Sequence, residues 1–165
     1  AGVIWDSLLE LGQAHCIRPA GYKALDSLRL EKGYVYWSTD VTPEDNLLEA
    51  GLGFCADMAK DKFTGRDALA KCKEEGLRTR LRTVVLEGNI FPAYGAESVW
   101  FNGEIVSRLR SAGHAHTIDR SIAYCYLPLD LAKPGTEVEI ELFGERVPAK
   151  VSLPIHDQRG TRLKA

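Results

Sequence analysis

The amino-acid sequence predicts an α+β fold in which a helical first half precedes an antiparallel β-barrel. Up to about residue 76, apolar residues recur every three to four positions, the spacing of amphipathic helices. From about residue 80, short β-branched runs alternate with turn residues, as is typical of an antiparallel barrel or sandwich. An Asn-Gly pair at 102–103 lies between two such runs, and it is the strongest short signal for a β-hairpin. We therefore expect a boundary near residues 76–80.

Three helices are expected, near residues 3–12, 22–32 and 65–75. The apolar side chains of the first helix fall at helical spacing; they are Val3, Ile4, Trp5, Leu8, Leu9 and Leu11. Gly12 can end this helix. Gly33 is a suitable stop for the second helix, because glycine readily adopts the left-handed backbone found just beyond helix ends.

The third helix has the clearest signals at its start. Thr64 can cap its N-terminus, and Asp67 places a carboxylate in the first turn, where the helix dipole favours negative charge. We expect this helix to end at Gly76. Residues 42–45 (TPED) resemble a further short helix start, with proline at the first helical position.

Six strands are expected in the second half of the chain. Residues 136–142 (TEVEIEL) alternate charged and apolar side chains with a period of two, as in a strand with one buried face. The other expected strands are 81–87, 98–101, 104–109, 120–127 and 146–153. We expect these strands to form an antiparallel barrel with a tight turn at Asn102-Gly103.

Composition and charge exclude several classes of protein. The chain has 165 residues, 45% of them hydrophobic, and its 21 Lys and Arg against 23 Asp and Glu give a net charge of −2. This balance excludes a disordered chain and argues against a nucleic-acid partner. No apolar run approaches the roughly 20 residues needed to cross a bilayer, so we expect no membrane partner. The first residues lack the features of a signal peptide, and a chain that begins with alanine suggests a fragment or a processed product.

Two short motifs could indicate a cofactor site or a metal site. Residues 51–56 (GLGFCA) match the dinucleotide pattern G-x-G-x-x-A, but no strand precedes them, so we expect a turn that leads into a short strand. His114 and His116 could ligate a metal, yet Asp119 is the only further ligand nearby. The four cysteines form no C-x-x-C pair. We therefore predict neither a metal site nor a flavin site in this chain.

Three arginines occupy alternate positions, as they would on one face of a strand. Arg78, Arg80 and Arg82 could bind a phosphate or a carboxylate, and a nucleic-acid-binding barrel would use them with an affinity that falls steeply with salt. A solvated strand face is the simpler interpretation. No G-x-S-x-G motif is present, which argues against a hydrolase.

A longer pattern resembles a known protein family. Its first part is Ser27-Leu28-Arg29-Leu30-Glu31-Lys32-Gly33-Tyr34, Trp37, Asp40, Leu48-Glu49-Ala50-Gly51-Leu52 and Phe63-x-Gly65-Arg66-x-Ala68-Leu69. Its second part is Trp100-x-Asn102-Gly103 and Ile118-Asp119-x-x-Ile122-Ala123-Tyr124. With these residues the chain resembles the aminomethyltransferase (glycine cleavage T-protein) superfamily, and it is most similar to the branch of sarcosine and dimethylglycine dehydrogenases.

The resemblance implies two domains and a role in one-carbon metabolism. Residues 1–78 would be the C-terminal part of the folate-binding domain, ending its middle subdomain, and residues 79–165 the C-terminal β-barrel. The parent enzyme would pass a one-carbon unit from an N-methyl amine to tetrahydrofolate, with FAD only in a domain absent from this chain. Its partners would be the upstream flavin and folate subdomains of the same polypeptide, in the bacterial cytoplasm or the mitochondrial matrix. Two alternatives remain: a T-protein aminomethyltransferase, and a non-enzymatic interaction module resembling the regulatory subunit of pyruvate dehydrogenase phosphatase.

The resemblance also suggests residues that line a folate pocket. The candidates are Tyr22, Arg29, Trp37 and, near the glutamyl end of folate, Arg162. Each has a simpler interpretation, because Arg29 could pair with Glu31 or Asp26, Trp37 could belong to the core, and Arg162 could be solvated.

The same family pattern places the catalytic machinery outside this chain. The acid that activates folate and the glutamate that grips the pterin ring lie upstream in the family, so no catalytic residue is assigned here. The arginine with which T-proteins contact folate corresponds to Leu25 in this sequence. We therefore expect the isolated chain to be inactive and to bind tetrahydrofolate weakly.

Overall fold

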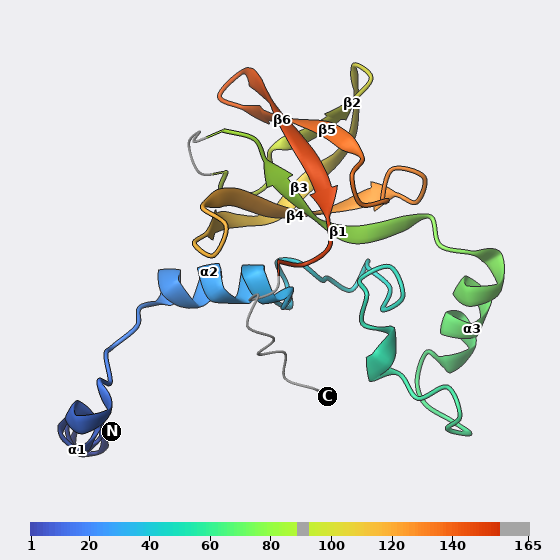
Figure 1. Ribbon diagram of the computed structural model, residues 1–165. Coiled ribbons are helices and arrows are strands. Elements are labelled where there is room, and N and C mark those ends of the chain that lie inside the picture. Colours follow the sequence, from blue (N-terminus) through green and yellow to red (C-terminus); the bar gives the residue numbers. More distant parts are fainter. Residues whose placement is uncertain (89–92, 156–165) are drawn as a thin grey trace.

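The computed structural model describes residues 1–88 and 93–155 and combines helices with a closed β-barrel (Figure 1). Its helices are α1 (Gly2–Gly12), α2 (Tyr22–Lys32) and α3 (Arg66–Glu75), with short 3-10 turns at Gln13–His15 and Gly53–Cys55. Its strands are β1 (Thr79–Leu86), β2 (Ser98–Phe101), β3 (Glu104–Ala115), β4 (Arg120–Pro128), β5 (Glu137–Leu142) and β6 (Glu145–Ser152). The predicted α+β class and the antiparallel barrel are confirmed.

The barrel closes in the order β1-β4-β3-β2-β5-β6, and neighbouring strands run antiparallel. Because the barrel closes, each of its strands is hydrogen-bonded to a neighbour on both sides over at least part of its length. Along β5 the apolar residues point inward and the glutamates outward, as the period-two pattern predicts. The interior is filled by small and branched side chains, among them Val84, Val99, Cys125, Leu127 and Ile140. Each fully buried branched side chain contributes about 1.5–3 kcal/mol.

The turn between β2 and β3 has the predicted hairpin geometry. Asn102 and Gly103 both adopt a left-handed backbone, with φ of 51° and 84°. Strand β3 is longer than predicted and reaches Ala115. Its pairing with β4 shifts register between Leu109 and Ala112 and then continues through Gly113 to Ala115. An added Cβ at Gly113 would lie 2.8 Å from Cδ1 of the fully buried Leu30, so a larger residue there would force that side chain to shift.

The three helices agree with prediction except in their local starts and caps. Gly33 ends α2 in the left-handed region, with φ of 79°, as expected. Thr64 is not the cap of α3: the helix begins after Gly65, whose φ of 88° makes the turn, and no side chain caps it. The predicted carboxylate in the first turn of α3, that of Asp67, is confirmed.

Two loops also differ from the predictions. Residues 42–45 form a turn instead of a helix, because the Asp45 carboxylate accepts the Thr42 backbone N–H and hydroxyl at 2.8 Å and the chain then turns away. The turn at Gly51 is present, with φ of 80°, but it leads into the 3-10 turn at Gly53–Cys55 and not into a strand.

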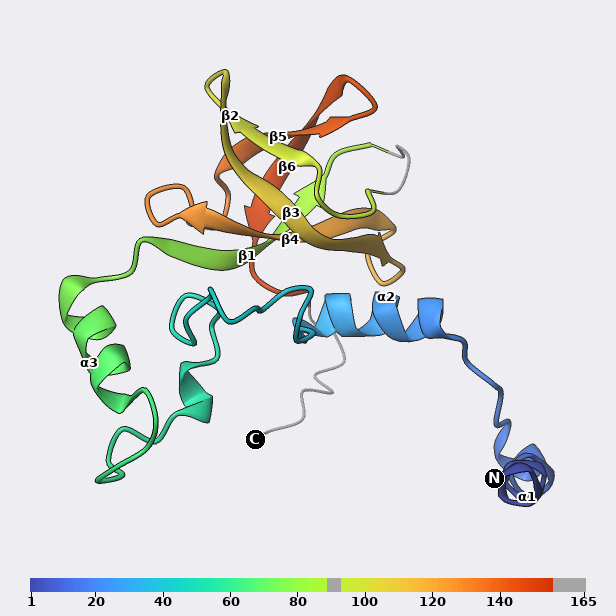
Figure 2. The same ribbon diagram turned by 180° about the vertical axis from the view of Figure 1, so that it is seen from behind.

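The helices occupy different positions relative to the barrel. Helix α2 lies across the outer surface of the barrel beside β3 and β4, whereas α1 lies well away from it (Figures 1 and 2). None of the residues of α1 is buried, and its exposed apolar side chains are Val3, Ile4, Trp5, Leu8 and Leu11. No described helix is long and apolar enough to span a membrane.

Candidate functional site

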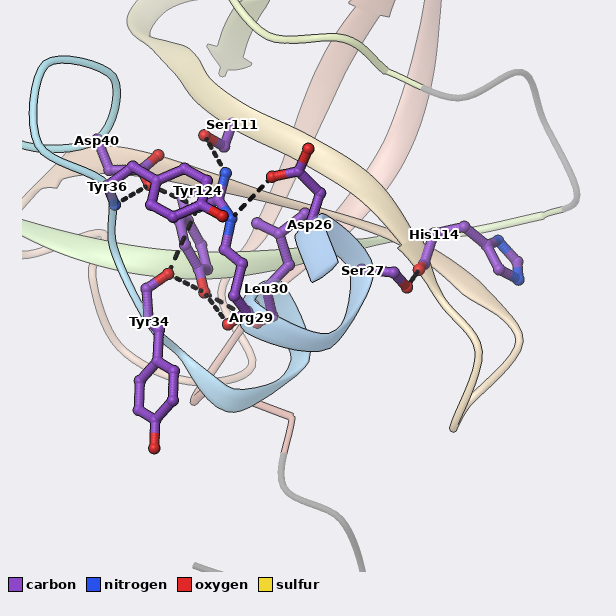
Figure 3. Close-up of polar contacts among 10 residues, drawn as sticks. All are labelled: Asp26, Ser27, Arg29, Leu30, Tyr34, Tyr36, Asp40, Ser111, His114 and Tyr124. Carbon is purple, nitrogen blue, oxygen red and sulfur yellow. Dashed lines mark hydrogen bonds and ion pairs between the residues drawn. The ribbon is translucent and has the colours of Figure 1, made fainter. Parts of the chain in front are cut away.

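Helix α2 is fixed to the barrel by polar contacts at the turn between β3 and β4. The Ser27 hydroxyl donates to the backbone carbonyl of His114 (Figure 3). The Glu31 carboxylate accepts both the hydroxyl of Thr117 and its backbone N–H, the latter at 3.1 Å. Between these contacts Leu30 is fully buried against a second small core formed with the outer face of β4. The helix therefore has little freedom to move relative to the barrel.

A buried ion pair lies beside this contact. The Arg29 side chain, 7% exposed, places Nη1 2.5 Å from Oδ2 of Asp40, which is 0% exposed. Arg29 Nη2 donates to the Ser111 hydroxyl of β3 at 2.9 Å, and Nε lies 3.4 Å from the Asp26 carboxylate (Figure 3). The same Asp40 oxygen accepts the backbone N–H of Tyr36 at 2.8 Å. The pair thus joins α2, the loop that follows it and the barrel.

Tyr36 of the loop and two tyrosines of β4, Tyr124 and Tyr126, complete this cluster. The Arg29 guanidinium lies 4.3 Å from the Tyr36 ring centroid and 5.7 Å from that of Tyr124. The Tyr124 hydroxyl donates to the Leu30 carbonyl at 2.8 Å, and burial raises its pKa well above the usual value, so it stays a neutral donor. Tyr126 donates to the Asp40 carbonyl at 3.2 Å.

The loop held by these contacts presents an exposed tryptophan. Between residues 36 and 41 the backbone folds tightly, with Ser38 at φ 73° and its N–H bound to the Val41 carbonyl at 2.8 Å. Trp37 lies on this loop and is 68% exposed. Since Asp40 accepts the Tyr36 amide and pairs with Arg29, the indole is displayed on a loop whose base is held by buried polar contacts.

The structure separates the residues that the sequence grouped as folate-pocket candidates. Tyr22 is the first residue of α2 and is 81% exposed, Trp37 is exposed beyond the other end of the helix, and Arg29 is buried between helix and barrel. Arg162 lies outside the described residues. Direct contact of any of the four with folate stays a prediction.

The simpler interpretations can be compared with the contacts. Trp37 does not belong to the core. Arg29 does contact Asp26, but its shortest ion pair is with Asp40. The Glu31 carboxylate instead accepts hydrogen bonds from Thr117. Asp40 belongs to the family pattern, but the sequence indicates no partner for it. The signal for a buried, paired Asp40 was that it is the single acid in the aromatic-rich segment 34–41 (YVYWSTDV).

The histidine pair forms a polar corner of the β3–β4 turn. The rings of His114 and His116 meet edge to face with centroids 4.8 Å apart, and His114 Nε2 lies 3.1 Å from Asp119 Oδ1. Within residues 1–88 and 93–155, no group of three or more His, Cys, Asp or Glu side chains is arranged to hold a metal ion.

Comparisons with known proteins agree with this architecture. Residues 79–156 match the model of the glycine cleavage T-protein C-terminal barrel domain, and residues 1–60 match that of the GCVT N-terminal domain. The chain belongs to the aminomethyltransferase superfamily. Within it, the crystal structure of the glycine cleavage system aminomethyltransferase T from Bartonella henselae matches 82% of this chain and 38% of that one, with a TM-score of 0.76 and 28% identity.

The aminomethyltransferase-like chain is also similar to parts of larger dehydrogenases. It is 38% identical over 159 residues to the mitochondrial sarcosine dehydrogenase of Mus musculus, covering 91% of this chain and 17% of the relative. It is 34% identical over 168 residues to the mitochondrial dimethylglycine dehydrogenase of Rattus norvegicus, covering 99% of this chain and 20% of the relative. The chain therefore spans about a fifth of the length of these relatives.

Proposed function

We propose that this chain forms one wall of the folate-binding unit of an enzyme like sarcosine or dimethylglycine dehydrogenase. The similarity to those dehydrogenases and to an aminomethyltransferase supports a one-carbon transfer role. The observation that carries the proposal is Trp37, an exposed indole on a loop fixed from below by the buried Arg29–Asp40 pair. Exposed aromatic side chains on rigid supports are suited to flat ligands.

In this proposal the wall would contact tetrahydrofolate along one side. Trp37 and Tyr22, beyond one end and at the other end of α2, would offer aromatic faces to the pterin or aminobenzoyl rings, while Arg29 would act behind Trp37 by holding its loop in place. Bound tetrahydrofolate would supply the nitrogen atoms that accept the one-carbon unit. Because the guanidinium of Arg29 faces Asp40 and Ser111, we assign it to positioning and not to ligand contact.

The partners of this wall would be the upstream flavin and folate subdomains of the same polypeptide. The exposed apolar side chains of α1, such as Trp5 and Leu8, are the surface that these subdomains would cover. FAD would belong to the flavin domain. By analogy with relatives named as mitochondrial and with bacterial aminomethyltransferases, the parent protein would act in the mitochondrial matrix or the bacterial cytoplasm.

A T-protein aminomethyltransferase is the second candidate, favoured by the structural match to the Bartonella henselae protein. Against it stands Leu25, which occupies the position that the family resemblance gives to a folate-contacting arginine. Leu25 is exposed on α2, so the position is open to a ligand but offers no cation. The dehydrogenase branch is therefore the better assignment.

Calorimetric titration with tetrahydrofolate tests the proposal at two levels. The chain alone should bind with a dissociation constant in roughly the millimolar range or weaker, about −4 kcal/mol, and should form no methylenetetrahydrofolate from formaldehyde. In the parent polypeptide, Trp37→Ala should weaken folate binding at least about tenfold. Phe143→Ala, which removes an exposed aromatic from the β5–β6 turn, should leave it unchanged. Equal effects of the two substitutions would contradict the proposed wall.

A further inference from the structure

The open part of the β1 edge borders a hollow that the proposed folate wall does not use. Strand β1 pairs with β4 from Thr79 to Val85, but with β6 only from Thr83 to Leu86. The first half of β1 therefore has one edge without a neighbouring strand. A hollow of about 250 Å³ lies there, closed by Gly33 after α2, by Gly51 and by the chain that follows β6.

Arg80 and Arg82 line this hollow, and none of its lining residues is acidic. Arg82 Nε donates to the Ala132 carbonyl at 2.7 Å, and its Nη1 lies 3.3 Å from the Leu81 carbonyl, which keeps the guanidinium at the open edge. Among the described residues, the carboxylate bound to this edge is that of Glu49, and its Oε1 accepts the backbone N–H groups of residues 78 and 79, each at 3.0 Å. Among the described residues, neither guanidinium has an ion-pair partner.

Arg80 is the less satisfied of the two. Its Nε is buried and has no hydrogen-bond partner in the part of the chain that the structure describes. The pKa of Arg82 is lowered by burial and by the positive charge of Arg80, so the two cations are close enough to disfavour each other. The expectation of a solvated strand face is thus wrong for Arg80 and Arg82, which are half-buried, whereas Arg78 is exposed but lies just before β1.

Two neighbouring, partly desolvated cations without a counter-charge are costly unless an anion joins them. Guanidinium groups bind oxyanions through paired N–H donors, which is the geometry that carboxylate and phosphate groups accept. We propose that the hollow beside β1 is a binding site for a small oxyanion, a phosphate or carboxylate group held between Arg80 and Arg82. The oxyanion is either a free ion or a group of a larger molecule. Separate probes can distinguish a phosphate from a carboxylate.

Thermal unfolding of this chain tests the site with defined probes. Inorganic phosphate and succinate are compared with sodium chloride at equal ionic strength, for the parent sequence and for Arg80→Met, Arg82→Met and Arg78→Met. At about ten times its dissociation constant, the preferred anion should raise Tm by about 3 °C. Arg78→Met is the matched control, since it removes an exposed arginine that lies directly before β1 and does not line the hollow, and it should keep the shift. Arg80→Met and Arg82→Met should lose it.

The free protein provides a second readout. Arg80→Met replaces a half-buried cation that has no ion-pair partner among the described residues by an apolar side chain of similar length, so it should leave Tm in chloride unchanged or raise it. If Arg82→Met fails to fold because it loses its carbonyl contacts, Arg80→Met alone decides. A larger shift with phosphate, or with succinate, identifies the group that binds. Equal shifts in all four proteins, no shift in any, or a marked loss of Tm for Arg80→Met in chloride would each overturn the proposal.

Discussion

Replacement of Arg29 by methionine should strongly destabilise the chain, because it leaves Asp40 buried without its cation. Asp40 is completely buried, its Oδ2 receives Arg29 Nη1 at 2.5 Å and the Tyr36 amide at 2.8 Å, and its Oδ1 has no partner among the described residues. Removing one partner of such a pair typically costs about 3–5 kcal/mol. For a chain of this size that is about 10 °C in Tm. Urea unfolding followed by tryptophan fluorescence measures the free energy of unfolding.

The double variant Arg29→Met/Asp40→Leu separates the charge pair from packing. If the cost comes from the unpaired carboxylate, the double variant should recover much of the stability lost in Arg29→Met, because no buried charge remains. Lys71→Met is the control for loss of a cation, since its i,i+4 pair with Glu75 is exposed, and it should cost less than about 0.5 kcal/mol. A cost below about 1 kcal/mol for Arg29→Met would show that the pair does not hold the loop.

Three further predictions follow from single residues. Gly113→Ala should destabilise by about 1–3 kcal/mol in a thermal melt, because its Cβ would meet the buried Leu30 at 2.8 Å, whereas Gly103→Ala, with open space around it, should cost only the strain of a left-handed backbone. Tyr124→Phe should cost about 1 kcal/mol by urea unfolding, since it removes the hydroxyl that donates to Leu30. Cys125, whose pKa burial raises to about 12, should not react with a thiol reagent at pH 8 until the protein unfolds, while the exposed Cys16 and Cys55 react at once.

The sequence predicts the barrel well because its strands have local signals. The Asn102-Gly103 pair and the alternation along residues 136–142 each reflect a constraint that acts within a few residues, so the hairpin and β5 lie where expected. The start of α3 was predicted less well, because Gly65 provides by backbone geometry what Thr64 was expected to provide by its side chain. For β3 the sequence predicts only residues 104–109, because the continuation to Ala115 depends on pairing with β4, which no local pattern indicates.

The candidate site was harder to predict, because its decisive contacts join residues far apart in the chain. Arg29 and Asp40 are 11 residues apart, and Ser111 is 82 residues from Arg29, so no local spacing indicates that they meet. Family resemblance pointed to Arg29 but not to its burial. Once the guanidinium is seen to be enclosed by Asp40, Ser111 and Tyr36, the same residue changes from a possible ligand contact to the support of a loop.

That change alters what a loss of function at Arg29 would mean. A ligand contact would weaken folate binding without lowering stability, whereas a support would lower both in proportion and would be rescued in part by the paired Asp40→Leu substitution. Trp37 should behave in the opposite way, because its exposed indole contributes little to the core but is available to a ligand. Measuring unfolding and folate affinity for both variants in the parent polypeptide therefore separates the wall of the pocket from the structure that holds it. If Trp37→Ala costs stability and Arg29→Met does not, the two roles are reversed and the positioning argument fails.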